Sequence, residues 1–301
     1  MKYDLIIVGA GPAGMTAALY ALRAEKSVLL LEREGYGGQI VLSDCVQNYP
    51  GIPDVNGYDL ADAMMEQIRT LGVTYVQQAV TGVEPTTEGY RVQTSKETYE
   101  SRAVILATGV THRKLAVPGE ETYLGKGVSF CAVCDGAFFR KKAVAVVGGG
   151  NTAVQDALYL AQLCDTVYLI HRREGFRAEE TLLERAKNTP NIQFLTNTVV
   201  REMRGEMRLQ SLVLENLQSK ELWELAVAGV FEAIGSIPQN QSFAPLVELD
   251  ADGYFAVDGS CCTLRPGLFV AGDCRQKQVR QLTTAVSDGT LAALEAVEYL
   301  K

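Results

Sequence analysis

The sequence lacks an excess of positive charge. Its 28 Lys and Arg residues stand against 36 Asp and Glu residues, for a formal net charge of −8 at pH 7. No overall attraction to nucleic acid or anionic lipid is therefore expected. The 2 histidines, His112 and His171, stand alone, which leaves a zinc site short of ligands, so no metal is expected. A length of 301 residues suggests about two domains.

Long uninterrupted hydrophobic runs are also absent. The stretch from Leu5 to Leu22 has 18 residues without a charge, but Gly9, Gly11 and Pro12 fall near its middle, where they would weaken a membrane-spanning helix. We therefore expect neither a membrane span nor a secretion signal. The 7 cysteines are then expected in a reducing cytoplasm, where a close pair is more often catalytic than structural.

A pattern typical of dinucleotide binding opens the chain. Tyr3–Val8 is an apolar run typical of a buried strand, the glycine turn Gly9–Gly14 comes next, and Met15–Ala24 has helical spacing of apolar residues. Ser27–Leu31 is a second apolar run that ends at Glu32. This order of elements favours a nucleotide site over a glycine turn without a ligand.

Each conspicuous residue of this pattern has a physical role in such a site. Gly9 permits the tight turn, Gly11 lets the backbone approach a pyrophosphate, and Gly14 lets helix and strand pack closely. The helix amino terminus offers N–H groups to the negative charge. Glu32 is expected to accept hydrogen bonds from ribose hydroxyls.

The pattern recurs 139 residues later, which indicates a duplicated domain. Gly148, Gly150 and Ala153 match the three glycines of the first turn, and His171 stands where Glu32 stands. The expected strand, helix and strand of this copy are Ala143–Val147, Asn151–Leu163 and Thr166–Ile170.

The acid of the first copy is replaced by basic residues in the second. Arg172 and Arg173 follow His171, and Arg177 lies four residues further on. Arginines would pair with the 2′-phosphate of NADPH, so this site is expected to prefer NADPH to NADH. A solvated basic patch without a ligand is the alternative.

Two cysteines supply an electron acceptor within the chain. Two dinucleotide sites in one protein usually mean a flavin and a nicotinamide. Cys131 and Cys134 have the spacing that lets one thiol attack and the other resolve in a redox disulfide. A zinc site and incidental buried cysteines are the alternatives. Asp135 could exchange protons with a thiol, although Asp135-Gly136 is also an ordinary turn.

These motifs resemble the low-molecular-weight, bacterial-type NADPH-dependent thioredoxin reductases over essentially the whole chain. The resemblance departs mildly at Val133, where the family more often has threonine, and at Gln47, where it often has an acid. The motifs that carry it, besides the first glycine turn, are Gly37-Gly38-Gln39, Asn48-Tyr49-Pro50-Gly51, Ala107-Thr108-Gly109, Cys131–Gly136, Gly148–Ala153, His171–Arg177, Ala271-Gly272-Asp273 and Arg280-Gln281.

The resemblance implies an α/β fold of two Rossmann-like dinucleotide-binding domains (FAD/NAD(P)-binding, three-layer), with the NADPH domain inserted in the FAD domain. The expected segments are 1–112 and 241–301 for FAD and 113–240 for NADPH and the cysteine pair. Cofactor-binding roles are expected at Gly9, Gly11, Pro12, Ala13, Gly14, Glu32, Gly38, Gln39, Asn48, Ala107, Thr108, Gly109, Gly272, Asp273, Arg280, Gln281, Gly148, Gly150, Asn151, Thr152, His171, Arg172, Arg173, Arg177 and Ile234. Five further cysteines are read as small packing residues, namely Cys45, Cys164, Cys261, Cys262 and Cys274.

The resemblance also implies a reaction and a partner. Electrons would pass from NADPH through FAD to the disulfide, with Cys134 against the flavin, Cys131 exchanging with oxidised thioredoxin and Asp135 as a catalytic acid. Because the disulfide and the nicotinamide site share one domain, that domain is expected to rotate, with hinges at Thr111–Lys114 and Ser236–Gln241. A homodimer through the FAD domain is expected. Another redoxin or a small disulfide as acceptor, ferredoxin as donor, and a non-catalytic flavin-binding module remain open.

Overall fold

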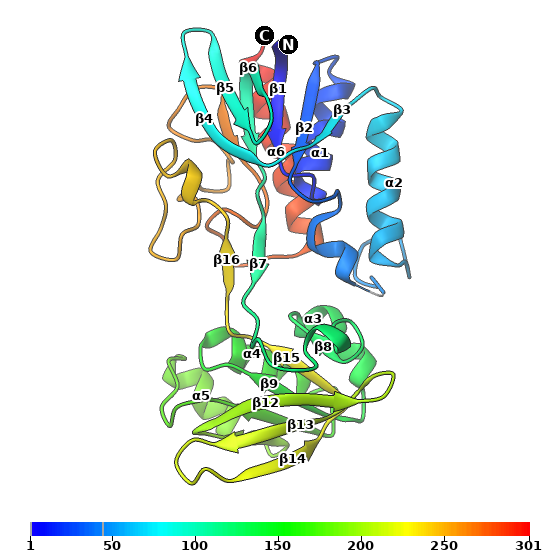
Figure 1. Cartoon of the computed structure of the whole chain (residues 1–301), viewed down its shortest axis with the longest axis vertical. Helices are drawn as coiled ribbons and strands as arrows, with labels where there is room; N and C mark the ends of the chain where they lie inside the picture. Colours follow the sequence, from blue (N-terminus) through cyan, green and yellow to red (C-terminus); the bar gives the residue numbers. More distant parts are fainter. Residues whose placement is uncertain (1, 44) are drawn as a thin grey trace. The chain divides into compact units, whose positions relative to one another are not determined.

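The computed structural model describes residues 2–43 and 45–301 and divides into two compact units (Figure 1). Unit 1 combines the chain up to Thr111 with Ile237–Lys301, and unit 2 is His112–Ser236. Unit 2 is therefore an insertion in unit 1. The chain crosses between them twice, through β7 (Val110–His112) and β16 (Ser236–Pro238), which pair with each other.

The sheet of unit 1 has a parallel part and an antiparallel edge. Its order is β3-β2-β1-β6-β5-β4, with β17 pairing in parallel with the carboxyl-terminal part of β6. The strands are β1 (Lys2–Val8), β2 (Val28–Glu32), β3 (Thr74–Gln77), β4 (Val80–Thr86), β5 (Gly89–Thr94), β6 (Thr98–Leu106) and β17 (Leu268–Val270). The helices are α1 (Pro12–Arg23), α2 (Gly57–Arg69) and α6 (Leu282–Tyr299), with short 3-10 segments η1 (Gly38–Leu42) and η4 (Gln241–Phe243).

β1 is buried on both faces, as its continuous apolar sequence predicts. Leu5 and Ile7 face a core shared with α1, α2 and α6. Ile6 and Val8 face a second core, built with the antiparallel strands and the segment around Phe255. The carboxyl ends of the parallel strands, where nucleotides bind in such sheets, therefore lie between two covered faces.

Unit 2 has three layers. Helices cover one face of a parallel sheet of order β11-β10-β9-β15-β8, and a separate antiparallel sheet, β12-β13-β14, shares the core on the other face. The parallel strands are β8 (Val128–Ser129), β9 (Ala143–Val147), β10 (Thr166–Ile170), β11 (Ile192–Leu195) and β15 (Gly229–Glu232). The remaining elements are α3 (Ala132–Asp135), α4 (Asn151–Leu160), α5 (Glu180–Lys187), β12 (Thr198–Gly205), β13 (Leu209–Asn216), β14 (Leu222–Ala226), and the 3-10 segments η2 (Glu121–Tyr123) and η3 (Gly136–Phe139).

The α/β class with two Rossmann-like domains is confirmed, and the element boundaries need three corrections. α1 begins at Pro12 rather than Met15, because Pro12 stands at its first position and the end of the glycine turn winds into the helix. α4 ends at Leu160 rather than Leu163. The apolar run that begins at Gly267 and ends at the acid Asp273 predicts a strand over residues 267–273, but β17 covers only Leu268–Val270, because Gly272, at φ +86°, turns the chain.

None of the helices within the described residues is long and apolar enough to cross a membrane. In the same residues no group of three or more His, Cys, Asp or Glu side chains is arranged to hold a metal ion.

Candidate active site

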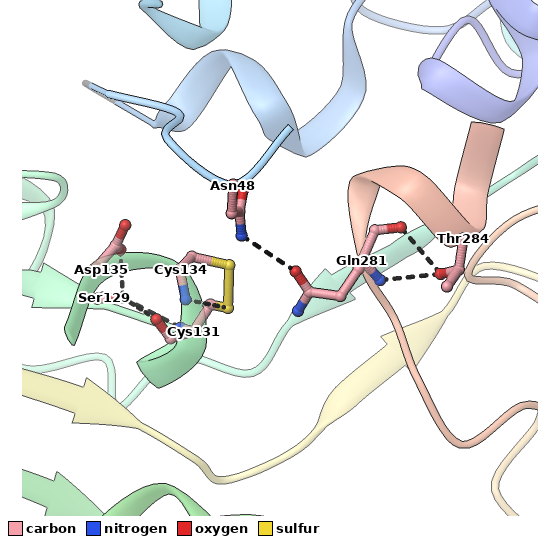
Figure 2. Close-up of a disulfide and its surroundings, with 7 residues drawn as sticks. All are labelled: Asn48, Ser129, Cys131, Cys134, Asp135, Gln281 and Thr284. Carbon is pink, nitrogen blue, oxygen red and sulfur yellow. Dashed lines mark hydrogen bonds between the residues drawn. A yellow bond between two sulfur atoms is a disulfide. The ribbon is translucent and has the colours of Figure 1, made fainter. Parts of the chain in front are cut away.

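Cys131 and Cys134 form a disulfide at the start of α3 in unit 2 (Figure 2). Their Cα atoms are 5.3 Å apart, within the usual range for a disulfide. Cys131 is the residue that caps α3, and the backbone N–H of Cys134 donates a hydrogen bond to its Sγ at 3.2 Å. Neither cysteine is fully buried. The pair is therefore built so that a negative charge on Cys131 Sγ would meet a backbone donor.

Asp135 is linked to the cysteine loop through Ser129. Ser129 Oγ donates to Asp135 Oδ2 at 2.6 Å, and the backbone N–H of Cys131 donates to the same Oγ at 3.1 Å (Figure 2). Ser129 is not among the site residues predicted from the sequence. Its position at the end of β8, two residues before Cys131, is the signal that could have found it.

The glycine turn of unit 1 leaves the start of α1 open to an anion. Gly11 caps the helix without a side-chain hydrogen bond, and no acid lies in the first turn. A Cβ at Gly11 would have only Gly38 Cα within 4.0 Å, so the backbone there is not covered by other atoms. Unpaired N–H groups at an open helix start fit a pyrophosphate.

Glu32 lies at the end of β2 and is bound to the backbone around the turn. Its Oε2 accepts from the N–H of Ala10 at 2.8 Å, and its Oε1 accepts from the N–H groups of Arg33 at 2.7 Å and Glu34 at 3.2 Å. A carboxylate has about four acceptor positions, so little capacity remains. The expected bond to a ribose would thus come from a carboxylate that already stabilises the turn.

Other predicted residues of unit 1 meet in pairs from distant parts of the chain. Asn48 Nδ2 donates to Gln281 Oε1 at 3.3 Å (Figure 2), and Gln39 Nε2 donates to the carbonyl of Val110. Asn48 and Gln281 are 233 residues apart in sequence. The carboxyl-terminal segment therefore returns to the amino-terminal part, as expected for a chain with an inserted domain.

Asn240, which sequence analysis missed, anchors the predicted Thr108. Its Oδ1 accepts from Thr108 Oγ1 at 2.8 Å, and its Nδ2 donates to the carbonyls of Gly253 at 3.0 Å and Cys274 at 2.8 Å. Asn240 is fully buried. No sequence motif marks this residue, because its partners come from three separate segments.

Asp273 belongs to a buried charged network in unit 1. Lys277 Nζ lies 3.3 Å from Asp273 Oδ1 and 3.0 Å from Asp288 Oδ2, and Arg275 pairs with Asp288 at 2.7 Å. Burial raises the pKa of Asp273, while Lys277 opposes the shift. Its Oδ1 is buried without a hydrogen-bond partner among the described residues, so the ion pair leaves it able to accept from a ligand hydroxyl.

Arg280 lies next to Asp273 and contacts an aromatic ring. Its Nε donates to the Asp273 carbonyl at 3.2 Å, and its guanidinium lies 4.0 Å from the centre of the Tyr254 ring. The guanidinium plane is therefore fixed by a cation–π contact rather than left free in solvent.

The glycine turn of unit 2 repeats the open helix start. Gly150 caps α4 without a side-chain hydrogen bond, and no acid lies in the first turn. Asn151, the first residue of α4, does not cap the helix: its Nδ2 donates to Glu179 Oε1 at 2.9 Å, and its Oδ1 accepts from the Glu179 N–H at 2.8 Å. Thr152 is exposed beside it, whereas Ile234 is half-buried against the unit 2 core.

His171 is buried, unlike the three arginines that come after it. The residue is 8% exposed, and its ring packs on Phe176, with ring centres 4.8 Å apart. A Cβ at Gly149 would lie 2.1 Å from this ring, so the middle glycine of the turn, which sequence analysis did not single out, is required by His171. The imidazole Nε2 is buried without a hydrogen-bond partner among the described residues.

Arg172, Arg173 and Arg177 are exposed, and in the described part of the chain none of them makes an ion pair. Burial is the largest of the effects that lower the pKa of His171, and the charges of all three arginines lower this pKa further. The arginines are thus close enough to act on one site, and their charges are not neutralised by acids of the described chain. This arrangement fits a phosphate group.

The other five cysteines divide by burial. Cys164, Cys261 and Cys274 lie in the apolar cores, which agrees with a packing role. Cys45 and Cys262 are half-buried. Cys45 Sγ donates to Asp54 Oδ1 at 2.7 Å.

Two dinucleotide-type turns and a cysteine pair held on a short helix define a class, the nucleotide-dependent disulfide oxidoreductases. The model of the pyridine nucleotide-disulphide oxidoreductase family matches residues 3–289, and the chain belongs to this family, in its bacterial-type thioredoxin reductase branch.

Relatives match over almost the full length. The chain is 42% identical to the thioredoxin reductase of Treponema pallidum over 299 residues, 99% of this chain and 97% of the relative, and 39% identical to that of Bacillus subtilis over 300 residues, 99% and 95%. Among solved structures, the thioredoxin reductase of Streptococcus pyogenes is 40% identical, with a TM-score of 0.96 and coverage of 99% and 98%. That of Lactococcus lactis in its FR conformation is 42% identical, with a TM-score of 0.67 and coverage of 99% of both chains.

Proposed function

We propose that this chain is a thioredoxin-disulfide reductase that uses NADPH and FAD. The observation that carries the proposal is the Cys131–Cys134 disulfide on α3, within the unit that holds the second glycine turn. Full-length relatives named thioredoxin reductase support thioredoxin as the acceptor.

The residues of the two turns fit the two cofactors. FAD would be held by the open start of α1, Glu32, Asn48 and Asp273, and NADPH by the start of α4 together with the three exposed arginines. When bound, these cofactors supply the two electrons that reduce the disulfide. The preference for NADPH over NADH rests on the arginines.

Cys131 is the residue expected to react with thioredoxin. Reduction breaks the bond between the two Sγ atoms and leaves two thiols after uptake of two protons. The Cys134 N–H that donates to Cys131 Sγ would favour the thiolate at Cys131. This thiolate attacks the thioredoxin disulfide, and Cys134 then attacks Cys131 in the mixed disulfide, which restores the Cys131–Cys134 bond and releases reduced thioredoxin.

Asp135 is expected to accept and donate protons during this thiol–disulfide exchange. Its Oδ2 is held by Ser129, which is also bound to the Cys131 N–H. Because the carboxyl is fixed next to the loop of the two cysteines, it can accept a proton when a thiol is activated and return it to a leaving thiolate.

We further propose that the two units change their relative orientation during turnover. The disulfide and the second glycine turn belong to the same unit, and the chain between the units is limited to β7 and β16. Two solved relatives of nearly equal identity and coverage give TM-scores of 0.96 and 0.67, which supports a fold with more than one arrangement.

A homodimer and a cytoplasmic location complete the proposal. The dimer would form through unit 1, and sedimentation velocity at micromolar concentration should give twice the monomer mass of 32.7 kDa. A monomer under these conditions would contradict it.

The central test replaces each cysteine in turn. Cys134→Ser should leave reduction of bound FAD by NADPH intact and reduce thioredoxin turnover to background, because the flavin loses its covalent acceptor. Cys131→Ser should also stop turnover while leaving a thiol at Cys134. The control Cys262→Ser, at a half-buried cysteine outside the pair, should keep near-normal turnover.

The same assay separates the alternatives. Turnover that persists in Cys134→Ser would overturn the role of the disulfide. A wild-type enzyme that oxidises NADPH with another redoxin but not with thioredoxin would overturn the acceptor, and reduction by ferredoxin but not NADPH would overturn the donor.

A further inference from the structure

Two glutamates are buried together where the connections enter unit 2. Glu120 precedes η2 on the outgoing chain, and Glu232 ends β15, four residues before Ser236 on the returning chain. Each residue is only 3% exposed. Carboxyl groups are rarely buried to this extent unless a partner satisfies them.

One oxygen of each carboxyl is satisfied by the same short stretch of backbone. The Leu115 N–H donates to Glu232 Oε2 at 3.2 Å, and the Val117 N–H donates to Glu120 Oε2 at 3.2 Å. Since Leu115 and Val117 come after β7, both carboxyls bind the outgoing connection.

The other oxygen of each carboxyl has no partner in the described part of the chain. Glu120 Oε1 and Glu232 Oε1 are buried without hydrogen bonds within residues 2–43 and 45–301, although the Glu120 carboxyl lies within hydrogen-bonding reach of Glu232. Two acceptor oxygens cannot satisfy each other unless a hydrogen lies between them.

Lys114 is not the missing hydrogen-bond partner of the two Oε1 atoms. Its positive charge acts on Glu232 and lowers the pKa of that carboxyl, but its Nζ pairs with the exposed Glu121 and its side chain remains 43% exposed. A proton is the remaining ligand that the described residues can hold there, and it would satisfy both oxygens at once.

We propose that Glu120 and Glu232 share one proton between their Oε1 atoms, and that this acid pair fastens the outgoing and returning connections to each other at the edge of unit 2. Burial raises the pKa of Glu232 to about 8, and the charge of Glu120 adds to the shift. The pair therefore holds its proton at neutral pH.

The surroundings of the pair explain why losing the proton would release the connection. The charged groups that act on Glu232 are Glu120 and Lys114, both on the outgoing connection. Val230, on the same strand face as Glu232, lies in an apolar core with Leu115 and Val117. Deprotonation would leave two adjacent negative charges in apolar surroundings.

The sign of the pH dependence is set by the raised pKa. The folded protein binds the proton more tightly than the unfolded chain, whose glutamate has the ordinary value of 4.5. The stabilisation is therefore fully present below about pH 4.5 and is lost as the pH rises through about 8.

Infrared difference spectroscopy of the full chain tests the shared proton directly. The wild-type minus E232Q difference spectrum at pH 6.5 should show the carbonyl stretch of a buried protonated carboxyl, and this band should disappear as the pH rises past about 8. The subtraction removes the band of Asp156, another carboxyl in the chain whose pKa burial raises, to about 7. Both E232Q and E120Q should lack the band of the acid pair, because Gln donates to the remaining carboxylate and no proton is held. The matched control E121Q, one residue from Glu120 but exposed, should keep the band.

Hydrogen exchange then tests whether the acid pair holds the outgoing and returning connections together. After correction for intrinsic rates, the amides of Leu115 and Val117 should lose protection between pH 6.5 and 9 in wild-type protein and keep it in E232Q, whose amide cannot ionise. This measurement does not involve the catalytic reaction. Its result is therefore independent of whether the proposed function is correct. Absence of the band in wild-type protein, or its persistence in E120Q, would overturn the proposal, and so would equal loss of protection in E232Q.

Discussion

The glycine turns of unit 1 and unit 2 share a backbone plan but differ in the side chains placed after the second strand. Both helices start at a glycine without a capping side chain. In unit 1, Glu32 then binds the backbone of the turn through Oε2 and the backbone of Arg33, the residue after it, through Oε1. In unit 2, His171 is buried on Gly149, and the exposed arginines come after it.

The comparison shows that stabilising the turn and selecting the nucleotide, which are both assigned to Glu32 in unit 1, are assigned to different residues in unit 2. In unit 1 a single carboxylate, Glu32, stabilises the turn and is also the residue proposed to bind a ribose. In unit 2 the imidazole stabilises the turn by packing, and the charge that would select the nucleotide moves to Arg172 and Arg173. On this proposal, the side chains after the second strand select the nucleotide, and the turn itself does not.

The largest expected effect is on nucleotide choice in unit 2. Replacing both Arg172 and Arg173 by Gln removes two charge-assisted contacts of about 1.5 to 3 kcal/mol each. If these contacts are additive, the KM for NADPH should rise by roughly two to four orders of magnitude, and less where neighbours do not add fully. The KM for NADH should stay nearly unchanged, because NADH has no 2′-phosphate.

Steady-state kinetics with both nucleotides provide the measurement. Arg140→Gln, at another exposed arginine of unit 2, is the matched control and should leave both KM values unchanged. Equal losses for NADPH and NADH in the double variant would mean that the arginines serve the fold, and the comparison of the two turns would fail.

A smaller effect is expected where the turns themselves differ, at Gly14 and its counterpart Ala153. A Cβ at Gly14 would lie 1.8 Å from the carbonyl oxygen of Gly9, whereas Ala153 carries a Cβ in unit 2. Gly14→Ala should therefore destabilise unit 1 by about 1 to 3 kcal/mol and weaken FAD retention. The reverse change, Ala153→Gly, should cost about 1 to 2 kcal/mol, through helix propensity and the loss of a buried methyl group.

Thermal unfolding with and without added FAD distinguishes these outcomes. A Gly14→Ala protein as stable as the wild type, with FAD fully retained, would show that the close approach of α1 and β1 is not required.

Local sequence is sufficient to predict the elements that carry the turns. The predicted ranges of β1, β9 and β10 agree with the structure almost to the residue, because buried parallel strands are continuous apolar runs. The antiparallel sheet β12-β13-β14 was not predicted. It completes the apolar core on one face of the unit 2 sheet, a partnership that the turn motifs do not indicate.

The sequence could not predict those contacts of the site that join side chains far apart along the chain. Glu120 and Glu232 meet only because β15 ends beside the outgoing connection. Asn240 binds Thr108 from 132 residues away. No spacing rule links such residues, since tertiary packing alone brings them together.

The smallest expected effect is the change in stability when the two histidines become charged. It tests whether His171, unlike the arginines after it, is uncharged at neutral pH. Burial lowers the pKa of His171 below its ordinary value of 6.5 and that of His112 to about 4. Because the folded protein binds these protons less tightly than the unfolded chain, this part of its stability is present above pH 6.5 and is lost as the pH falls. Nuclear magnetic resonance of the two imidazole rings, assigned with His171→Asn, should give both midpoints below 6.5. A His171 midpoint above that value would mean that an imidazolium stands with the arginines as a phosphate ligand, and the division of roles in unit 2 would be wrong.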